Sequence, residues 1–525
     1  MSNLATVDLN FMAVAPLITL AVAALLVLIL DLVLPADRSR PWLYAAGVGG
    51  VLVALLYTYQ LWWGPAAGPA ASVVGAGALG RLSTGIAVFG GHYVLDRFTL
   101  IFHALVLIAV LCALLMSAPR RDEEKSGYLA LLLGAALGMG VLAGAGSFFT
   151  LFLGLEILSL NLYVAVAFER GKVTAQEAGF KYLILGAAAT ATMVYGFALL
   201  YGQTGTMALS GLAAGWHSGS TVLMKVGLGL VLFGLFFKLA LAPFHFWAPD
   251  VYQGASAPVT AFMSVGTKAA SFAALVRILL AALPEEPSRF LLPLWILAVL
   301  SMVVGSFSAA VQNNVKRLLA YSGVAHVGYL MMSLLGLSDR GVTAGLFYLG
   351  AYLFMNIGAF AVVAGLGRSG RDGEELADFT GLFYRRPGLA LAMTLFLLSL
   401  AGMPPAAGFQ GKLYLVLAAL ASGAGAAAWW LVGALVVTTG VSAYAYLRVA
   451  AEMFRKAEPA AASGTEGYRE AAAAAHGPES AAAGAGAPFS WALAAVLAVA
   501  ALGTLYLGVF PQSALALTQY VLPLP

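Results

Sequence analysis

Long apolar segments with almost no charged residues dominate this chain and limit what it can fold into. The first, from Phe11 to Leu34, carries one charged residue, and about 20 apolar residues suffice to cross a bilayer. Charged residues make up 10% of the 525 positions, whereas soluble proteins contain about 25%. The segments are continuous and do not alternate as the strands of a membrane barrel do. The sequence therefore predicts an all-α polytopic membrane protein.

The distribution of basic residues predicts how the segments cross the membrane. With the N-terminus outside, the predicted inner loops contain sixteen Lys and Arg residues and the outer loops contain five, and inner loops of membrane proteins are enriched in these residues. The first segment is longer than the apolar core of a signal peptide and follows no basic region, so we expect it to be retained. About fourteen spans with both termini outside are predicted, beginning near Phe11, Trp42, Phe98, Gly127, Ser147, Thr174, Thr221, Pro258, Phe290, Val315, Gly341, Pro387, Ala427 and Ser490.

Two regions interrupt the helical pattern. Residues 64–95 are rich in glycine and contain short β-like runs, which predicts an external loop that can contain a hairpin. Residues 457–488 are low in complexity and predict a flexible cytoplasmic linker before the last span. The only cysteine, Cys112, excludes a disulfide framework, a cysteine-bound zinc site and an iron–sulfur cluster within this chain. The net charge of +4 is small and the basic residues are scattered, which argues against a nucleic-acid partner.

Six basic residues fall inside the predicted spans. Arg277 and Arg448 lie toward span ends, where we expect their side chains to reach the membrane interface. Lys268 lies ten residues after Pro258, which places it about 15 Å deep at the helical rise of about 1.5 Å per residue. Four lysines are therefore predicted to lie within the membrane, and they are Lys181, Lys238, Lys268 and Lys412.

One acidic residue is placed at a comparable depth. Glu156 lies nine residues into its span, or about 14 Å deep, where an ionised side chain costs roughly 2.5–3.5 kcal/mol. A single carboxylate cannot pair with four lysines, although salt bridges between helices are an alternative role for some of them. Because desolvation disfavours the charged form of a lysine, unpaired lysines can exchange protons near neutral pH. The set predicts a proton relay.

Two proline-containing stretches interrupt otherwise apolar spans. One is "KLALAPFHFWAPD", residues 238–250, and the other is "AGMPPAAGFQGK", residues 401–412. Proline ends the hydrogen-bond pattern of a helix, and a helix broken within a membrane must face protein or a water-filled cavity. His245 lies in the first break and either exchanges a proton near neutral pH or is a hydrogen-bonded structural histidine. The breaks predict polar sites within spans seven and twelve.

The two breaks lie about 160 residues and five spans apart. An odd number of spans reverses the direction of the second unit, and inverted repeats with broken helices are typical of transporters. We therefore predict two inverted five-helix repeats. The predicted division is 1–125 for helices one to three with the loop 64–95, 126–285 for the first repeat, 286–456 for the second, 457–488 for the linker and 489–525 for helix fourteen.

Several stretches resemble one family of membrane proteins over roughly residues 95–455. They resemble the antiporter-like membrane subunits of respiratory complex I, the bacterial NADH:quinone oxidoreductase. The residues that carry the resemblance are "LGLEILSLNLYVAVAF", "KLALAPFHFWAPDVYQGASAPVTAFMSVGTKAA", "VKRLLAYSGVAHVGYLMM" and "GMPPAAGFQGKLYL", and "PDVYQGASAPVTAF" is similar to the N-type subunits. Lys412 differs from the glutamate of M-type subunits, and the chain ends soon after span fourteen, unlike the L-type subunits with their long lateral helix.

The resemblance implies a function and a set of residues. It implies a subunit that translocates protons without redox chemistry of its own, assembled with other membrane subunits of complex I in the bacterial cytoplasmic (inner) membrane. NADH, FMN, iron–sulfur clusters and quinone would be bound in or between other subunits, with no cofactor in this chain. The positions that match the family's membrane sites are Glu156 on span five, Lys238 before the break of span seven, Lys268 on span eight, Lys412 at the break of span twelve, and Lys181 and His245 as further members of the polar axis.

Other functions remain open from the residues alone. A Mrp-type cation/proton antiporter subunit or a membrane hydrogenase subunit would share the broken helices. A solute carrier, from a different class, would be expected to place more Asn, Gln and Trp at the midplane. The predicted midplane polarity is mostly lysine, which suits protons better than solutes.

Overall fold

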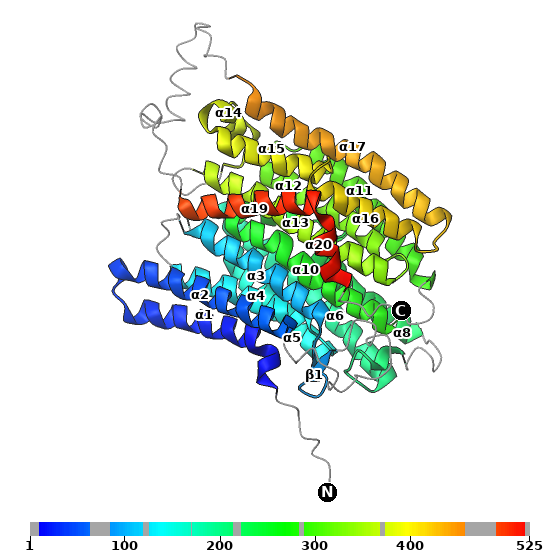
Figure 1. Ribbon diagram of the computed structural model, residues 1–525. Helices are drawn as coiled ribbons and strands as arrows, with labels where there is room; N and C mark the ends of the chain where they lie inside the picture. The colour runs from blue at the N-terminus through cyan, green and yellow to red at the C-terminus, as the bar shows by residue number, and fades with distance from the viewer. Residues whose placement is uncertain are drawn as a thin grey trace.

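The structure is a computed structural model that describes residues 10–63, 85–118, 125–169, 171–213, 222–282, 288–367, 373–456 and 490–519 (Figure 1). Within these ranges, all regular structure is helical apart from one short hairpin. The elements are α1 (Ala15–Val33), α2 (Ala36–Trp63), β1 (Ile86–Val88), β2 (Tyr93–Leu95), α3 (Arg97–Ser117), α4 (Lys125–Ala143), α5 (Phe148–Val166), α6 (Val173–Thr204), α8 (Val222–Leu239), α9 (Trp247–Gly254), α10 (Ala257–Ala282), α11 (Ser288–Ala310), α12 (Val315–Met331), α13 (Asp339–Leu366), α14 (Leu382–Arg385), α15 (Pro387–Ala401), α16 (Ala407–Leu420), α17 (Ala426–Phe454), α19 (Trp491–Val509) and α20 (Pro511–Gln519).

The predicted all-α membrane architecture is confirmed. In the described part of the chain, 12 helices are long and apolar enough to cross a membrane. The remaining two predicted spans correspond to α12, which has 17 residues, and to the shorter pair α15 and α16. The total of fourteen crossings therefore stays a prediction, although a helix lies at each predicted position.

The two predicted non-helical regions are described only in part. Strands β1 and β2 pair in antiparallel register, with Ile86 opposite Leu95 and Val88 opposite Tyr93, so a hairpin forms in the second half of the predicted loop. Residues 64–84 and the predicted linker at 457–488 lie outside the described residues.

The helices pack into an elongated bundle, with α1 and α2 at one end and α17 at the other (Figure 1). Helix α10 lies at the centre of this bundle, packed against α3, α4, α5, α8, α12 and α13, and every residue of α10 is buried. Large apolar side chains are exposed on the outer helices, including Leu25, Phe180 and Trp430. Because apolar surface is stable where it faces lipid or another subunit, the chain is a multi-pass membrane protein with α10 as its shielded core.

Both predicted helix breaks are present, and side chains satisfy backbone groups at each. Helix α8 ends at Leu239, Ala240 has φ +57°, and the chain resumes as α9. The Ala242 amide donates to Ser301 Oγ at 2.8 Å, and Trp247 Nε1 donates to the Phe237 carbonyl at 2.8 Å. These bonds replace those that a broken helix loses inside a membrane.

The second break has the same local order. Helix α15 ends at Ala401, Gly402 has φ +82°, and α16 begins at Ala407. The amide of Gly408 donates to Ser399 Oγ at 3.1 Å. A residue with positive φ thus turns the chain at both breaks, which is a conformation that glycine adopts without strain.

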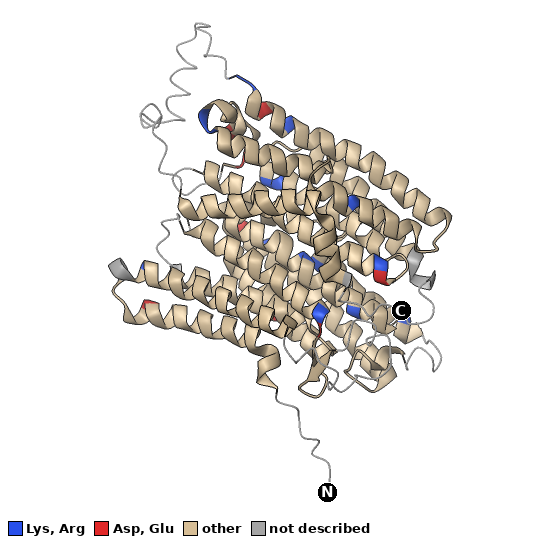
Figure 2. Cartoon of the chain, viewed as in Figure 1, with Lys and Arg blue, Asp and Glu red and all other residues tan. Residues whose placement is uncertain are grey.

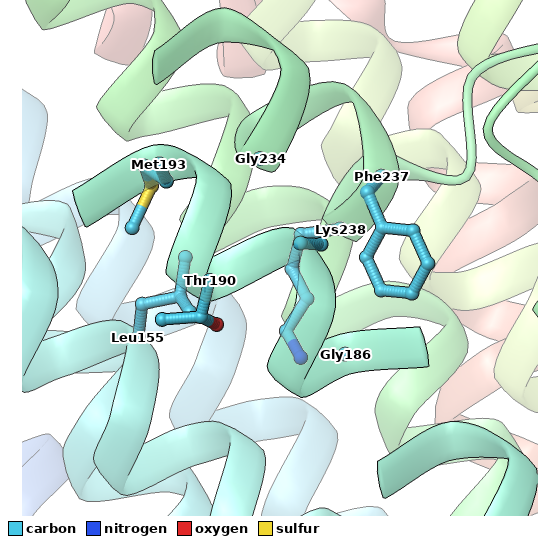
Figure 3. A pocket seen from close by; sticks show the side chains of 8 residues that line it. Leu155, Gly186, Thr190, Met193, Gly234, Phe237 and Lys238 are labelled. Carbon is cyan, nitrogen blue, oxygen red and sulfur yellow. The ribbon is translucent and has the colours of Figure 1, made fainter. Parts of the chain in front are cut away.

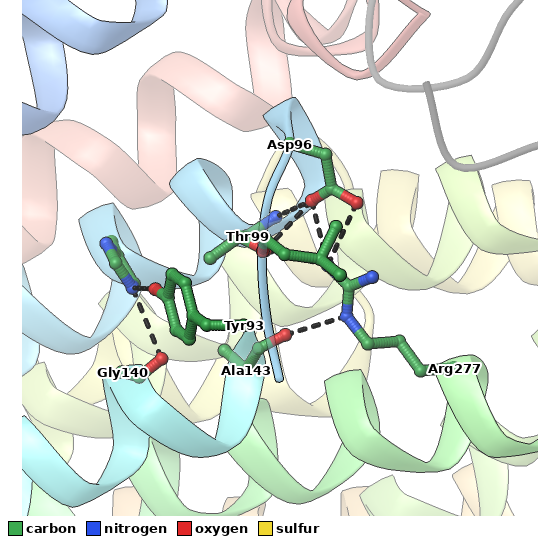
Figure 4. A network of polar contacts seen from close by, with 8 residues as sticks. Tyr93, Asp96, Thr99, Gly140, Ala143 and Arg277 are labelled. Atoms are coloured by element: carbon green, nitrogen blue, oxygen red, sulfur yellow. Dashed lines mark hydrogen bonds and ion pairs between the residues drawn. The ribbon is translucent and has the colours of Figure 1, made fainter. Parts of the chain in front are cut away.

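The expectation that Arg277 reaches the membrane interface is wrong. Its side chain is 0% exposed, and Nη2 lies 2.8 Å and 2.9 Å from the two oxygens of Asp96 (Figure 4). Arg277 also donates to Thr99 Oγ1 at 2.7 Å and, through Nε, to the Ala143 carbonyl at 2.9 Å. Asp96 is the N-cap of α3 and follows the hairpin, which places it over the end of α10. This placement depends on tertiary structure, so the sequence could not reveal the pair.

Candidate functional site

Three of the predicted lysines are buried inside the helical bundle. Lys238 on α8, Lys268 on α10 and Lys412 on α16 are 2%, 3% and 6% exposed. Charged residues are sparse among the helices, and a few Lys or Arg positions lie away from the helix ends (Figure 2). None of the three lysines forms an ion pair with a carboxylate of the described residues, whose ion pairs are formed by other basic residues. Their charge is therefore not neutralised by a direct partner in this conformation.

Tyrosines surround the first of these lysines. Lys238 Nζ donates to Tyr182 Oη at 3.2 Å and lies 4.8 Å from the centre of the Tyr182 ring and 5.3 Å from that of Tyr163. Lys238 lines a narrow gap between α5, α6 and α8, which Thr190 also lines and which is too small for a water molecule (Figure 3). Aromatic faces stabilise a cation without fixing it as a carboxylate would, so this lysine has partners compatible with either protonation state.

Glu156, the acidic residue predicted to lie within the membrane, makes no direct ion pair with Lys238. The glutamate lies on α5 and is partly buried. Lys238 instead has the tyrosine contacts given above. The two side chains are thus not paired in this conformation.

The second lysine lies at the centre of the molecule. Lys268 Nζ donates to Tyr352 Oη at 3.1 Å and lies 5.0 Å from the centre of that ring. A Cβ added at Gly323 on α12 would lie 2.3 Å from Lys268 Nζ. The ammonium therefore occupies space that is available because position 323 has no side chain.

The third lysine binds backbone groups at the second break. Lys412 Nζ donates to the carbonyls of Leu400 and Ala401 at 3.1 Å and 3.2 Å and to Thr439 Oγ1 at 3.3 Å. It also lies 4.9 Å from the centre of the Tyr329 ring. These carbonyls are free because α15 ends there, so the break supplies the ligands of the ammonium.

A buried histidine that the predicted site omitted lies between Lys268 and Lys412. His326 on α12 is 3% exposed. Its Nδ1 is 2.6 Å from Tyr348 Oη and its Nε2 is 3.4 Å from Tyr446 Oη. Its ring centre lies 5.2 Å from that of Tyr352, which binds Lys268, and 5.5 Å from that of Tyr329, which faces Lys412. A histidine eleven residues into a membrane helix was the sequence signal that could have identified it.

The other two predicted residues lie in different surroundings. Lys181 has a side chain that is 42% exposed and forms ion pairs with Glu177 at 2.8 Å and Asp250 at 2.9 Å. Asp250 also pairs with Arg317 at 2.6 Å. Lys181 therefore belongs to a partly exposed charge cluster beside α9 and does not share the environment of the buried lysines.

His245 lies in the first break, as predicted from the sequence. It is 7% exposed, its ring is 6.2 Å from that of Tyr321, and its Nδ1 has no hydrogen-bond partner in the described part of the chain. The structure brings no buried lysine into hydrogen-bonding contact with it among these residues.

The arrangement supports proton exchange by chemically simple groups. Lysine, histidine and tyrosine can each accept or donate a proton, and they follow one another across α8, α10, α12, α13 and α16. Among the described residues, no cluster of three or more His, Cys, Asp or Glu is placed to hold a metal ion. Lysine, histidine and tyrosine side chains in this arrangement are suited to proton transfer.

Comparisons with known proteins place the chain in a family. A sequence profile described as "NADH:quinone oxidoreductase/Mrp antiporter, TM" matches residues 145–442. NADH-quinone oxidoreductase subunit N 1 of Symbiobacterium thermophilum is 45% identical over 516 residues, which cover 96% of this chain and 97% of that protein. NADH-quinone oxidoreductase subunit N of Trichlorobacter lovleyi is 44% identical over 73% of this chain and 80% of that protein.

Solved structures show the same fold. A chain of respiratory complex I from Thermus thermophilus with bound aureothin is 35% identical, with a TM-score of 0.73 over 95% of this chain and 98% of that chain. A chain of the Mrp complex from Dietzia sp. DQ12-45-1b has a TM-score of 0.80 at 24% identity over 98% of this chain and 97% of its own length. With the profile match and a near-complete relative at 45% identity, the chain belongs to the NADH:quinone oxidoreductase/Mrp antiporter transmembrane family.

Proposed function

We propose that this chain is an N-type, proton-translocating subunit of a bacterial NADH:quinone oxidoreductase. The proposal is supported by relatives named NADH-quinone oxidoreductase subunit N, one of which is matched over 96% of this chain. In this proposal the chain lies in the inner membrane with both termini outside, beside other membrane subunits of the complex. NADH, FMN, iron–sulfur clusters and quinone are bound in or between other subunits, and this chain contributes no redox chemistry.

The protons are proposed to move along the buried lysines. The observation that carries this step is that Lys238, Lys268 and Lys412 are buried without a carboxylate partner among the described residues. A permanently charged, unpaired group at this depth is expensive, so groups that gain and lose protons explain why the site tolerates them. Tyr352 and His326 link the second lysine to the third.

Glu156 is proposed to control the first lysine. When the carboxylate approaches Lys238 it stabilises the protonated amine, and when it withdraws the desolvated amine releases its proton. Lys181 and His245 are proposed as further members of the path. Lys181 belongs to the charge cluster beside α9, and His245 lies in the break between α8 and α9.

The experiment measures NADH-driven proton pumping by the assembled complex in vesicles. Lys238→Met and Glu156→Gln are expected to lose most of the pumping while the subunits still assemble. Lys225→Met is the matched control, because Lys225 lies on the same helix but is exposed. If Lys238→Met pumps as well as Lys225→Met, the relay is refuted.

A second candidate is a subunit of a Mrp-type cation/proton antiporter. The matching profile covers both kinds of complex, so it is compatible with this alternative as well. Purification of the chain with its native partners distinguishes the two, because flavin and iron–sulfur subunits accompany it only in the oxidoreductase. A membrane hydrogenase would be recognised in the same experiment by its metal-containing subunit.

The two inverted repeats, at 126–285 and 286–456, are proposed to supply half-channels that open to opposite sides. This division is supported by the parallel order of the two breaks, where Ala240 and Gly402 both have positive φ before the second half-helix. Blocking proton access from one side of the membrane at a time should inhibit one half-channel at a time.

A further inference from the structure

Helix α10 carries a row of polar side chains between one end of the molecule and Lys268. Ser256, which precedes the helix, Thr260 and Ser264 lie at successive steps of four residues before Lys268. Steps of four follow one ridge of a helix. The three hydroxyl-bearing residues are 5%, 0% and 0% exposed. A polar ridge therefore runs through the most deeply buried helix of the chain and ends at its lysine.

Helix α13 adds a polar group beside this ridge. Asn356 Nδ2 donates to Ser264 Oγ at 2.5 Å, one turn away from the contact of Lys268 with Tyr352. Asn356 is 0% exposed, and its Oδ1 has no hydrogen-bond partner among the described residues. If the amide is turned over, the donor end is left without a partner instead. Either way, half of a buried amide is unsatisfied at the centre of the molecule.

The end of the polar ridge away from Lys268 lies beside an ion pair at the protein surface. Ser256 Oγ is buried without a hydrogen-bond partner in the described part of the chain. The carbonyl of the preceding Ala255 accepts from Lys316 Nζ at 2.7 Å, and Lys316 pairs with Glu374 at 3.1 Å. The Glu374 side chain is 23% exposed, so this end reaches the surface on the predicted inner side.

We propose that Ser256, Thr260, Ser264 and Asn356 form a water-assisted proton route from the inner surface to Lys268. This inference rests on the proposed function, because it assumes that Lys268 exchanges protons. Hydroxyls four residues apart are separated by about 6 Å along the axis, which is too far for a direct hydrogen bond. Water molecules between them complete the chain, held by the unsatisfied Ser256 hydroxyl and Asn356 amide.

The transfer is balanced at every step. Each water or hydroxyl oxygen accepts one proton and releases another to the next oxygen, and the last proton forms an N–H bond on the neutral Lys268 amine. After the transfer, the hydroxyl groups and waters rotate back to their starting orientation, and none of them has gained or lost a proton overall. A purely structural explanation covers part of the row, since Thr260 Oγ1 donates to the Ser256 carbonyl at 3.0 Å, as hydroxyls in membrane helices often do. It does not explain the unsatisfied Asn356 amide.

The test compares two buried threonines, one on the proposed route and one far from it. Thr260→Val removes the hydroxyl and keeps the side-chain volume. Thr504→Val on α19 is the matched control, because Thr504 is also 0% exposed and its hydroxyl donates to a carbonyl four residues earlier at 2.7 Å. NADH-driven pumping by the assembled complex is expected to fall about tenfold in Thr260→Val, below the roughly 10²–10⁴ that a positioned proton-transfer group supplies. Thr260→Ser should restore it, and Thr504→Val should pump normally.

The outcomes separate the route from the relay. Equal pumping by Thr260→Val and Thr504→Val would overturn the route. Lys268→Met is measured in parallel, and normal pumping by that variant would instead refute the relay. Asn356→Leu should match Thr260→Val. A structure of the assembled complex that resolves water should show water bound at Ser256 Oγ and at the Asn356 amide, and continuous apolar packing at both atoms would also overturn the route.

Discussion

At the scale of single residues, the missing side chain of Gly323 decides where the Lys268 ammonium can lie. A Cβ at position 323 would be 2.3 Å from Lys268 Nζ and 3.1 Å from Tyr352 Oη. Gly323→Ala should therefore displace a flexible side chain, keep the fold and reduce pumping by the assembled complex. Gly350→Ala on α13 is the control, because a Cβ added there would have no atom of another part of the chain within 4 Å. Equal pumping by the two variants would show that the position of the ammonium is unimportant.

Lys412 distinguishes proton release from simple binding of carbonyl groups. Lys412→Arg keeps the positive charge that the Leu400 and Ala401 carbonyls bind, but arginine does not deprotonate in proteins. We expect the variant to assemble and to lose pumping, because the proposed relay requires the group at position 412 to release its proton. Pumping is measured as the NADH-driven acidification of vesicles that contain the assembled complex. Normal acidification would assign Lys412 a structural role at the break.

At the scale of elements, the buried pair of Arg277 and Asp96 joins α10 to the hairpin end of α3. Removing one partner of a buried ion pair typically destabilises a protein by about 3–5 kcal/mol, whereas an exposed pair contributes about 0–1 kcal/mol. Arg277→Met should therefore lower the unfolding temperature of the purified protein clearly. The control is Arg455→Met, since Arg455 is 69% exposed and lies 3.8 Å from Glu452. A similar small effect of both substitutions would contradict the role of the pair.

At the scale of the whole molecule, the predicted orientation has a direct chemical test. Cys112 is buried, so background labelling by a membrane-impermeant maleimide should be low. Gln512→Cys, at an exposed position of α20, should react from outside intact cells. Lys456→Cys, exposed after α17, should react only after the membrane is opened. The reverse pattern would place the termini inside and invert both proposed half-channels.

The sequence by itself determined the class of protein and the places where its helices break. Apolar length and low charge act within a single segment, and proline disrupts a helix within one turn. These features were therefore readable at Pro243 and in residues 401–412 without knowledge of any neighbour. The positions of Lys238, Lys268 and Lys412 along their spans were readable for the same reason, whereas their burial depends on the helices packed against them.

Only the tertiary structure decided which groups meet. Lys268 and Tyr352 are 84 residues apart in the chain, and Arg277 and Asp96 are 181 apart. It also separated Lys181, which is partly exposed and paired with acidic residues, from the buried lysines, and it placed His326 between two of them. Such contacts depend on how helices pack against one another, and many different pairings satisfy the same pattern of apolar segments. The physical reason is that membrane insertion acts on each segment, whereas a proton path needs atoms a few ångströms apart from several of them.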